Sequence, residues 1–228
     1  MTDEKKQNAG NEIEGAILST YSKTEHFIHE NRKMVSYVTV GLVALIIGVI
    51  GFKYFQNNRE QEAQKRLFWA QQMFEQDSFK LALKGDASNY GFLKVKDKFG
   101  WTKAANLCDY YSGICYLNTG DFKKAIESLN SFNSSDEVLE GYKLCMIGDA
   151  NMELNNTEEG LKYYSKAANN TENEFAAPYF IMKAGNALEH SKKYSDAKDM
   201  YNRIKEKYVN SQQFRQIDAY IARCEANL

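Results

Sequence analysis

The sequence contains a single proline and only three histidines among its 228 residues. Because proline interrupts the interior of helices and sheets, its near absence favours uninterrupted helices joined by short corners. A glycine-rich phosphate loop, a G-x-S-x-G turn and an H-E-x-x-H helix are missing too. His26 and His29 stand three apart without a third ligand, which fits a solvated helix face better than a metal site. We therefore predict a protein that is not an enzyme, with no catalytic residues, no metal and no cofactor.

The sequence also lacks paired cysteine motifs and a large excess of either positive or negative charge. Cys108 and Cys115 would lie about 10 Å apart on one helix, beyond the reach of a disulfide. We expect them, with Cys145 and Cys224, to be free and buried, which leaves the cellular compartment open. The net charge of −1 excludes a generally basic surface, and with it a general nucleic-acid or anionic-lipid binder.

One long apolar run interrupts this hydrophilic composition. It reads MVSYVTVGLVALIIGVIGF, from Met34 to Phe52, and holds no charged residue. With Tyr54 and Phe55 it is long enough to cross a hydrocarbon core of about 30 Å as a helix. A buried core helix would carry some polar residues, and a signal peptide would be shorter and followed by a small-residue cleavage site. We expect an uncleaved transmembrane helix at 34–55.

Small residues within this run share one helical stripe. Their spacing of three, four and three places together Gly41, Ala44, Gly48 and Gly51. Such a stripe lets a second transmembrane helix approach closely, although glycine is common in membrane helices generally. We hypothesise a partner helix in the bilayer. The flanking lysines and arginines do not decide the orientation of the span.

The flanking regions carry helical patterns. The polar tail at 1–33 contains amphipathic spacing from Ile13 to Phe27, which suits a membrane surface or a partner. After the span, apolar spacing predicts one long helix over 58–84 and a shorter one over 91–99. We take 56–100 as connecting helices that lead into a repeat domain.

Internal repetition is the strongest domain signal. Three glycines stand 35 and 37 residues apart, each followed twelve residues later by another small residue: Gly113, Gly148 and Gly185, then Ala125, Gly160 and Ala197. The period is that of a tetratricopeptide helix pair. We expect three such pairs over 101–210, in which the small residues of the two helices face each other. The apolar spacing over 211–228 predicts a capping helix.

The first helix of each pair is expected to line a concave face. The repeat phase assigns to it Tyr110, Ile114 and Leu117, then Tyr142, Asp149 and Met152, then Tyr179, Met182 and Asn186, together with Leu107, Cys145 and Glu189. Rings and methionines suit extended or helical apolar peptides. Only Lys183 is basic there, which disfavours a clamp for an acidic carboxyl terminus. Alternatively, several of these residues pack against the helix after the span.

Residues 56–225 resemble the membrane-anchored tetratricopeptide proteins common in the Bacteroidetes. The resemblance lies in FGWTKAANLCDYYSGICYLNTGDFKKAIESL, in EFAAPYFIMKAGNAL and in YSDAKDMYNRIKEKYVNS. The architecture is similar to the YfgM-like family of ancillary Sec translocon subunits. This resemblance implies a cytoplasmic amino terminus, one inner-membrane span, a periplasmic repeat domain, and association with the translocon, periplasmic chaperones or exported chains.

The expected fold is therefore all-α, with a single N-terminal transmembrane helix followed by a tetratricopeptide α-solenoid. The expected function is a membrane-anchored scaffold for protein–protein interaction in the translocon and chaperone network. The alternative is a cytosol-facing adaptor or receptor anchored in a membrane. Neither nucleic acid nor a small-molecule substrate is expected as a partner.

Overall fold

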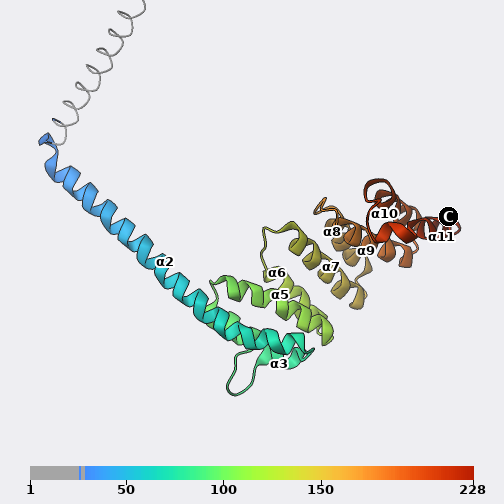
Figure 1. Ribbon diagram of the computed structural model, residues 1–228, viewed down its shortest axis with the longest axis horizontal. Coiled ribbons are helices and arrows are strands. Elements are labelled where there is room, and N and C mark those ends of the chain that lie inside the picture. The colour runs from blue at the N-terminus through green and yellow to red at the C-terminus, as the bar shows by residue number, and fades with distance from the viewer. Residues whose placement is uncertain (1–25, 27–28) are drawn as a thin grey trace, which may run out of the picture. The chain divides into compact units, whose positions relative to one another are not determined.

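A computed structural model describes His26 and residues 29–228, and these form an all-helical protein (Figure 1). The chain divides into two compact units, Met1–Asn57 and Asn58–Leu228. The long helix α2 (Arg32–Glu75) contributes residues to both. The all-α expectation is thereby confirmed. The amphipathic pattern expected at 13–27 lies outside the described residues, apart from His26.

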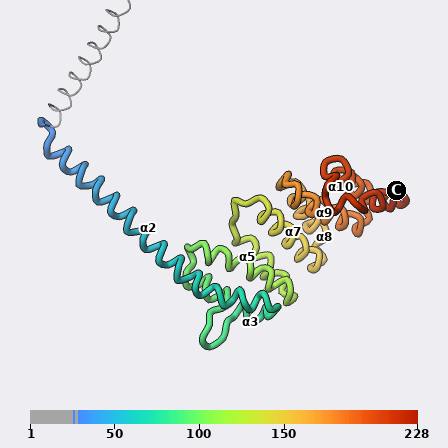
Figure 2. Tube along the Cα trace, in the orientation of Figure 1, coloured from blue at the N-terminus to red at the C-terminus, as the bar shows by residue number. Residues whose placement is uncertain are grey.

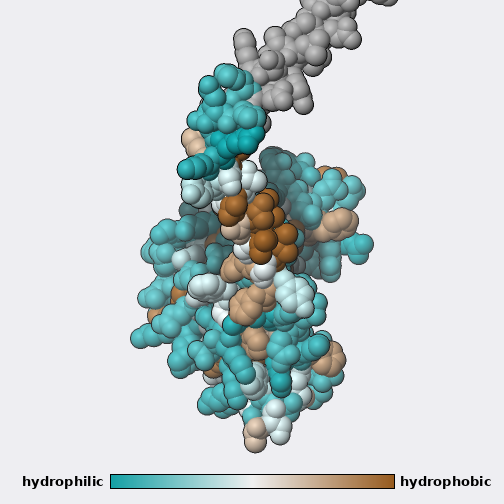
Figure 3. Space-filling model, turned by 90° about the vertical axis from the view of Figure 1, so that its left-hand side faces the viewer, coloured by the Kyte–Doolittle hydropathy of each residue, from teal (hydrophilic) through white to brown (hydrophobic). Residues whose placement is uncertain are grey.

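In the first unit, α2 carries the apolar run. Its large hydrophobic side chains between Met34 and Phe55 are exposed apart from Val35, which is half-buried, and strongly hydrophobic side chains gather in one patch in Figure 3. Within the described part of the chain, α2 is the one helix that is long and apolar enough to cross a membrane. Within the described residues, a Cβ added at Gly41, Gly48 or Gly51 would meet no atom within 4 Å beyond the adjacent backbone of its own helix. The small-residue stripe is open, and its partner helix stays a prediction.

The end of α2 differs from the expected helix over 58–84. The helix stops at Glu75, and a separate helix α3 (Phe79–Lys84) follows. Asp77 has a φ of 55°, and Ser78 donates its backbone N–H to the Met73 carbonyl oxygen at 2.9 Å. This left-handed residue with a six-to-one hydrogen bond is a Schellman end. Asp77 therefore breaks the predicted single helix in two.

The second unit continues as a succession of short helices (Figure 2). After α4 (Phe92–Phe99) come three pairs: α5 (Lys103–Asn118) with α6 (Phe122–Ser131), α7 (Glu137–Glu153) with α8 (Thr157–Ala168), and α9 (Ala177–His190) with α10 (Tyr194–Lys207). The turn η1 (Gln213–Gln216) and α11 (Ile217–Glu225) close the chain. Most helices pack chiefly on the helices next to them in sequence, as in a solenoid.

The corner inside each pair repeats the same geometry. Gly120, Asn155 and Lys192 all have positive φ, at 79°, 61° and 59°. The residue after each donates its backbone N–H to a carbonyl oxygen five positions earlier, at 2.9 Å in all three corners. The three corners are 35 and 37 residues apart, which is the period of the glycines on the first helices. Each first helix therefore ends in the same Schellman motif.

The repeat glycines allow close packing within the pairs. A Cβ added at Gly113, Gly148 or Gly185 would lie 2.5, 2.7 or 2.5 Å from the large side chain sixteen residues later, which is Leu129, Tyr164 or Tyr201. Each glycine thus admits a large residue of the second helix. In the second pair the two small residues do meet, because a Cβ added at Gly160 would lie 3.2 Å from the Gly148 carbonyl oxygen. In the other two pairs the facing of the small residues stays a prediction.

Two buried clusters hold the second unit together. One joins Ala63, Leu67 and Ala70 of α2 to α3, α4 and α5, and the other joins α7 through α11. All four cysteines are free and buried, as predicted. Burial raises the pKa of the Cys108, Cys115 and Cys145 thiols to about 12. These thiols stay protonated at neutral pH and act as core side chains.

Candidate functional site

Tyrosines occupy equivalent faces of the first helices, and we call Tyr110 of α5, Tyr142 of α7 and Tyr179 of α9 the tyrosine row. Tyr142 and Tyr179 are 38% and 37% exposed, and their ring centroids are 5.6 Å apart. Both rings contact the Phe180 ring, with centroid distances of 5.0 and 5.7 Å, and Phe180 itself is fully buried. The pair is therefore a fixed aromatic surface facing solvent.

Tyr110 continues the row towards the first repeat. Its ring is half-buried and lies 5.0 Å from Phe132 and 6.1 Å from Tyr111. Burial raises the pKa of Tyr110, and the nearby Tyr111 and Tyr142 hydroxyls raise it further. Burial also raises the pKa of Tyr179, although Lys183 lowers it. Both hydroxyls therefore remain protonated near neutral pH and are able to donate hydrogen bonds.

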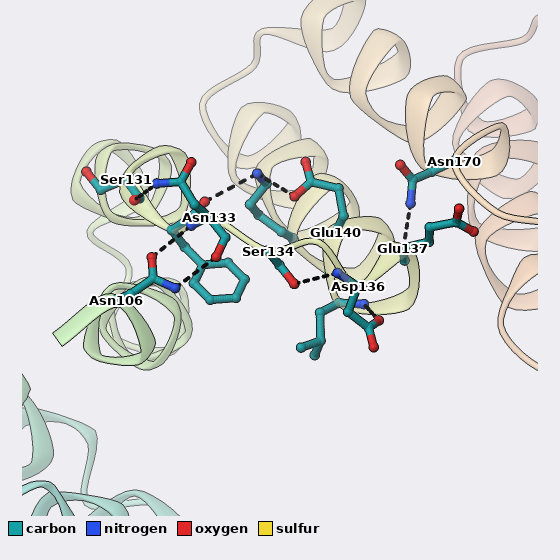
Figure 4. A network of polar contacts seen from close by, with 11 residues as sticks. Asn106, Ser131, Asn133, Ser134, Asp136, Glu137, Glu140 and Asn170 are labelled. Carbon is teal, nitrogen blue, oxygen red and sulfur yellow. Dashed lines mark hydrogen bonds and ion pairs between the residues drawn. The ribbon is translucent and has the colours of Figure 1, made fainter. Parts of the chain in front are cut away.

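A polar network holds the start of α7, the helix that carries Tyr142 (Figure 4). Asn106 of α5 and Asn133 of the α6–α7 loop exchange two hydrogen bonds, of 2.8 and 2.9 Å. Asp136 caps α7 by accepting the backbone N–H groups of residues 138 and 139, both at 2.9 Å. From the end of the same pair, Asn170, which follows α8, donates to the Glu137 carbonyl oxygen at 2.5 Å. The network ties α5, the α6–α7 loop and the end of α8 to the amino-terminal end of α7.

Asp149 links the second and third repeats. It accepts the Tyr164 hydroxyl at 2.5 Å and the Lys183 ammonium at 2.7 Å. Burial lowers the pKa of Lys183, but the hydrogen bond and the charge of Asp149 outweigh this and hold the pKa above its usual value. The one basic residue expected on this face is thus neutralised by its neighbour, and the face presents rings rather than net charge.

Asn186 holds the equivalent position in the third repeat. The Tyr201 hydroxyl donates to Asn186 Oδ1 and to Glu189 Oε2, both at 2.9 Å. Arg223 of α11 donates through Nη2 to Glu189 Oε2 at 2.8 Å and also through Nε to the other carboxylate oxygen. A hollow of about 500 Å³ lies here, lined by Asn186, Glu189, His190, Tyr194, Tyr220, Arg223 and Asn227. These bonds fasten the capping helix to the third repeat.

The Glu189 cluster predicts a pH dependence of stability. Hydrogen bonds from Arg223, and to a smaller extent from Tyr201, hold the pKa of Glu189 below its ordinary value of 4.5. A depressed folded-state pKa contributes stability above the unfolded-state pKa, and this is lost as the pH falls through the folded value. We expect the midpoint temperature of thermal unfolding to decrease as the pH is lowered from about 6 to about 3, and to decrease less in Glu189→Gln. If calorimetry gives the same dependence of the midpoint on pH for both proteins, this role of Glu189 is contradicted.

The other predicted face residues mostly serve the fold. Met152 and Met182 pack against the C-terminal core, and Met152 also covers Gly160. Ile114 and Leu117 are half-buried, and Cys145 is buried. Leu107 packs with the cluster that contains Leu67 of α2. Leu107 therefore shares a cluster with the helix after the span, and the alternative that several of the face residues pack against that helix stays a prediction.

Sequence reasoning missed the tyrosines that lie beneath this face. Tyr164 and Tyr201 belong to second helices, yet their hydroxyls reach Asp149 and Asn186 on first helices. A signal was present, because each tyrosine stands sixteen residues after a repeat glycine and its acceptor stands one residue after that glycine. The first repeat has Leu129 and Ile114 at the same two places and needs no hydrogen bond there.

Comparison with known proteins agrees with this architecture. Residues 25–219 match the family model of the tetratricopeptide repeat-like domain. No curated protein and no solved structure matches the chain. Domains of this kind generally bind other proteins, and their fold is typically non-enzymatic. With its repeating glycines, repeating corners and stacked helix pairs, the chain belongs to the tetratricopeptide repeat-like family.

Proposed function

We propose that this chain is a membrane-anchored scaffold that holds apolar polypeptide segments against the tyrosine row. The exposed pair Tyr142 and Tyr179 carries the proposal, because two large rings are fixed side by side on a buried phenylalanine. Rigid aromatic rings supply contact area with little loss of side-chain entropy. The neutralised charges beside them favour apolar segments over charged ones. The exposed apolar run of α2 supports the anchoring.

Charge on the tyrosine row tests this proposal. In Tyr142→Lys and Tyr179→Lys chains, purified from membranes in mild detergent, we expect recovery of bound polypeptides to fall about tenfold, the effect of losing a central aromatic contact. Tyr163→Lys, on the second helix α8, is the matched control and should leave recovery unchanged. Unchanged recovery in both row variants, with the helical content preserved, would reject the row as the binding surface.

For the compartment, we propose an inner-membrane protein with a cytoplasmic amino terminus and a periplasmic repeat domain, accessory to the Sec translocon and its chaperones. The YfgM-like resemblance of residues 56–225 supports this assignment. A reporter fused after Leu228, or protease added to spheroplasts, tests the orientation. A carboxyl terminus that is protected in the cytosol would reject the periplasmic assignment and favour the cytosol-facing adaptor, while the tyrosine row would remain a candidate.

A further inference from the structure

The Trp101 side chain is almost fully exposed to solvent. It is 86% exposed, whereas the nearby residues Phe99 and Thr102 are only 5% and 6% exposed. A large apolar ring left in water forgoes the favourable free energy of burial, so Trp101 is available to contact an apolar or interfacial surface. The corner at 100–102 joins α4 to α5.

Hydrogen bonds tie this corner to the first residues of the second unit. Glu60 accepts the Lys103 backbone N–H at 2.6 Å, at the amino-terminal end of α5. Arg59 donates to the Lys98 carbonyl oxygen at 2.6 Å, and its guanidinium lies 5.8 Å from the Phe99 ring. Thr102 caps the same helix by accepting the Ala105 N–H at 3.1 Å. Trp101 is therefore held beside residues 59 and 60.

Chain connectivity then brings the corner close to the proposed membrane span. Glu60 is five residues after Phe55, so the covalent chain keeps the two within about 18 Å whatever angle the two units adopt. The headgroup region adds roughly 5–8 Å to each side of the hydrocarbon core. Tryptophan is enriched at this boundary, because its ring is apolar while its N–H donates a hydrogen bond.

The segment of the chain that contains Trp101 is rich in lysine, which suits lipid phosphates. Between residues 90 and 104 the chain has four lysines and a single aspartate, in contrast to its net charge of −1 overall. Lys94, Lys98 and Arg66 lie 4.2, 5.3 and 5.2 Å from the Tyr90 ring, so three cations gather at one point. Only Arg66 among these three has a carboxylate within ion-pair distance, namely Glu62 at 3.1 Å. A local cationic patch next to a span favours anionic headgroups.

We propose that the α4–α5 corner rests on the lipid surface, with the Trp101 indole at headgroup level and the nearby lysines facing lipid phosphates. This inference rests on the membrane anchoring proposed above. It makes Trp101 a second membrane contact that restrains how the repeat domain is held next to the bilayer, so that the tyrosine row is presented at a limited distance from the membrane.

Quenching by brominated lipid tests the contact in the full-length chain. The sequence has two tryptophans, so Trp69→Phe leaves Trp101 as the only one. In vesicles of phosphatidylcholine and phosphatidylglycerol brominated near the glycerol end of the acyl chain, we expect Trp101 emission to fall to about half. Without the anionic lipid, the quenching should weaken by about twofold.

A matched control moves the tryptophan to another exposed site. In the chain with Trp69→Phe, Trp101→Phe and Phe175→Trp, the single indole replaces a phenylalanine that is 91% exposed, and brominated lipid should leave its emission unchanged. Flotation with the vesicles after carbonate extraction reports the anchor separately. An anchored chain with unquenched Trp101 would overturn this inference alone and leave Trp101 for a protein partner. A chain that fails to float would overturn the anchoring and this inference with it.

Discussion

Replacing Phe180 by alanine is expected to lower the free energy of unfolding by about 4 kcal/mol, the largest effect of any single substitution considered for this chain. Phe180 is 0% exposed and supports the rings of Tyr142 and Tyr179 at 5.0 and 5.7 Å. A Cβ added at Gly141 would lie only 2.3 Å from Phe180 Cε2, so α7 and this ring fit closely. Truncation leaves a cavity between α7 and α9, which the helices fill only in part.

Phe175 provides the matched control for this prediction. It lies five residues earlier in the chain and is 91% exposed, so Phe175→Ala should change stability by less than about 0.5 kcal/mol. The two variants are compared by thermal unfolding, where the Phe180 loss corresponds to a fall of roughly 10 °C in the midpoint. Similar midpoints for the two variants would contradict the close packing of α7 on α9. Binding should also weaken in Phe180→Ala, because the tyrosine row loses its support.

Introducing valine at Gly185 should destabilise the chain by about 3 kcal/mol. The added Cβ would lie 2.5 Å from Tyr201 Cε1, and Tyr201 is 0% exposed. The ring cannot move without losing hydrogen bonds, because its hydroxyl is bonded to both Asn186 and Glu189 at 2.9 Å. Separation of α9 from α10 would break those bonds and loosen the Glu189 contact with Arg223 of the capping helix.

Gly100 is the control glycine for this substitution. A Cβ there would lie 3.6 Å from the Lys96 carbonyl oxygen, an ordinary contact, and the backbone has a right-handed helical conformation. Gly100→Val should therefore leave the urea midpoint nearly unchanged, whereas Gly185→Val should lower it clearly. If the two valine variants unfold at the same urea concentration, the close approach of α9 to α10 is wrong.

The helix pairs were predictable because their signal is local. A glycine on the first helix recurs with the same period as the left-handed residue at its end, so Gly113, Gly148 and Gly185 suffice to place three pairs. The break of α2 at Asp77 was not predictable in the same way. An aspartate in the left-handed conformation leaves no mark in the apolar spacing, which continues from Phe74 to Leu81 without a change of phase.

The candidate site was predictable only at its surface. Helical phase put Tyr142 and Tyr179 on one face, and the structure brings their rings together. It also put Asp149 and Asn186 there, but their acceptor atoms are used by tyrosines fifteen residues later. Which second-helix residue reaches which first-helix residue depends on the register between two helices. Periodicity within a single helix carries no information about that register.

Periodicity within one helix also does not show that earlier helices cover the first repeat. Leu107 has the phase of a binding residue, yet it joins the cluster of Leu67 and Phe92. Tyr111 stacks on Phe92 with centroids 5.1 Å apart and meets Phe74 at 5.0 Å. The terminal unit of a solenoid has no neighbouring repeat on one side, so other helices must bury its apolar face. Here α2, α3 and α4 do so.

Photo-crosslinking from the tyrosine row tests the central claim most directly. A photoreactive phenylalanine derivative placed at Tyr179, in chains irradiated within intact membranes, should form adducts with other polypeptides. The same probe at Tyr163 should form few, because that position is on the second helix α8 and is not part of the row. Adducts that are abundant at Tyr179 and scarce at Tyr163 are the predicted result. Equal yields at the two positions, or none at Tyr179, would contradict the account.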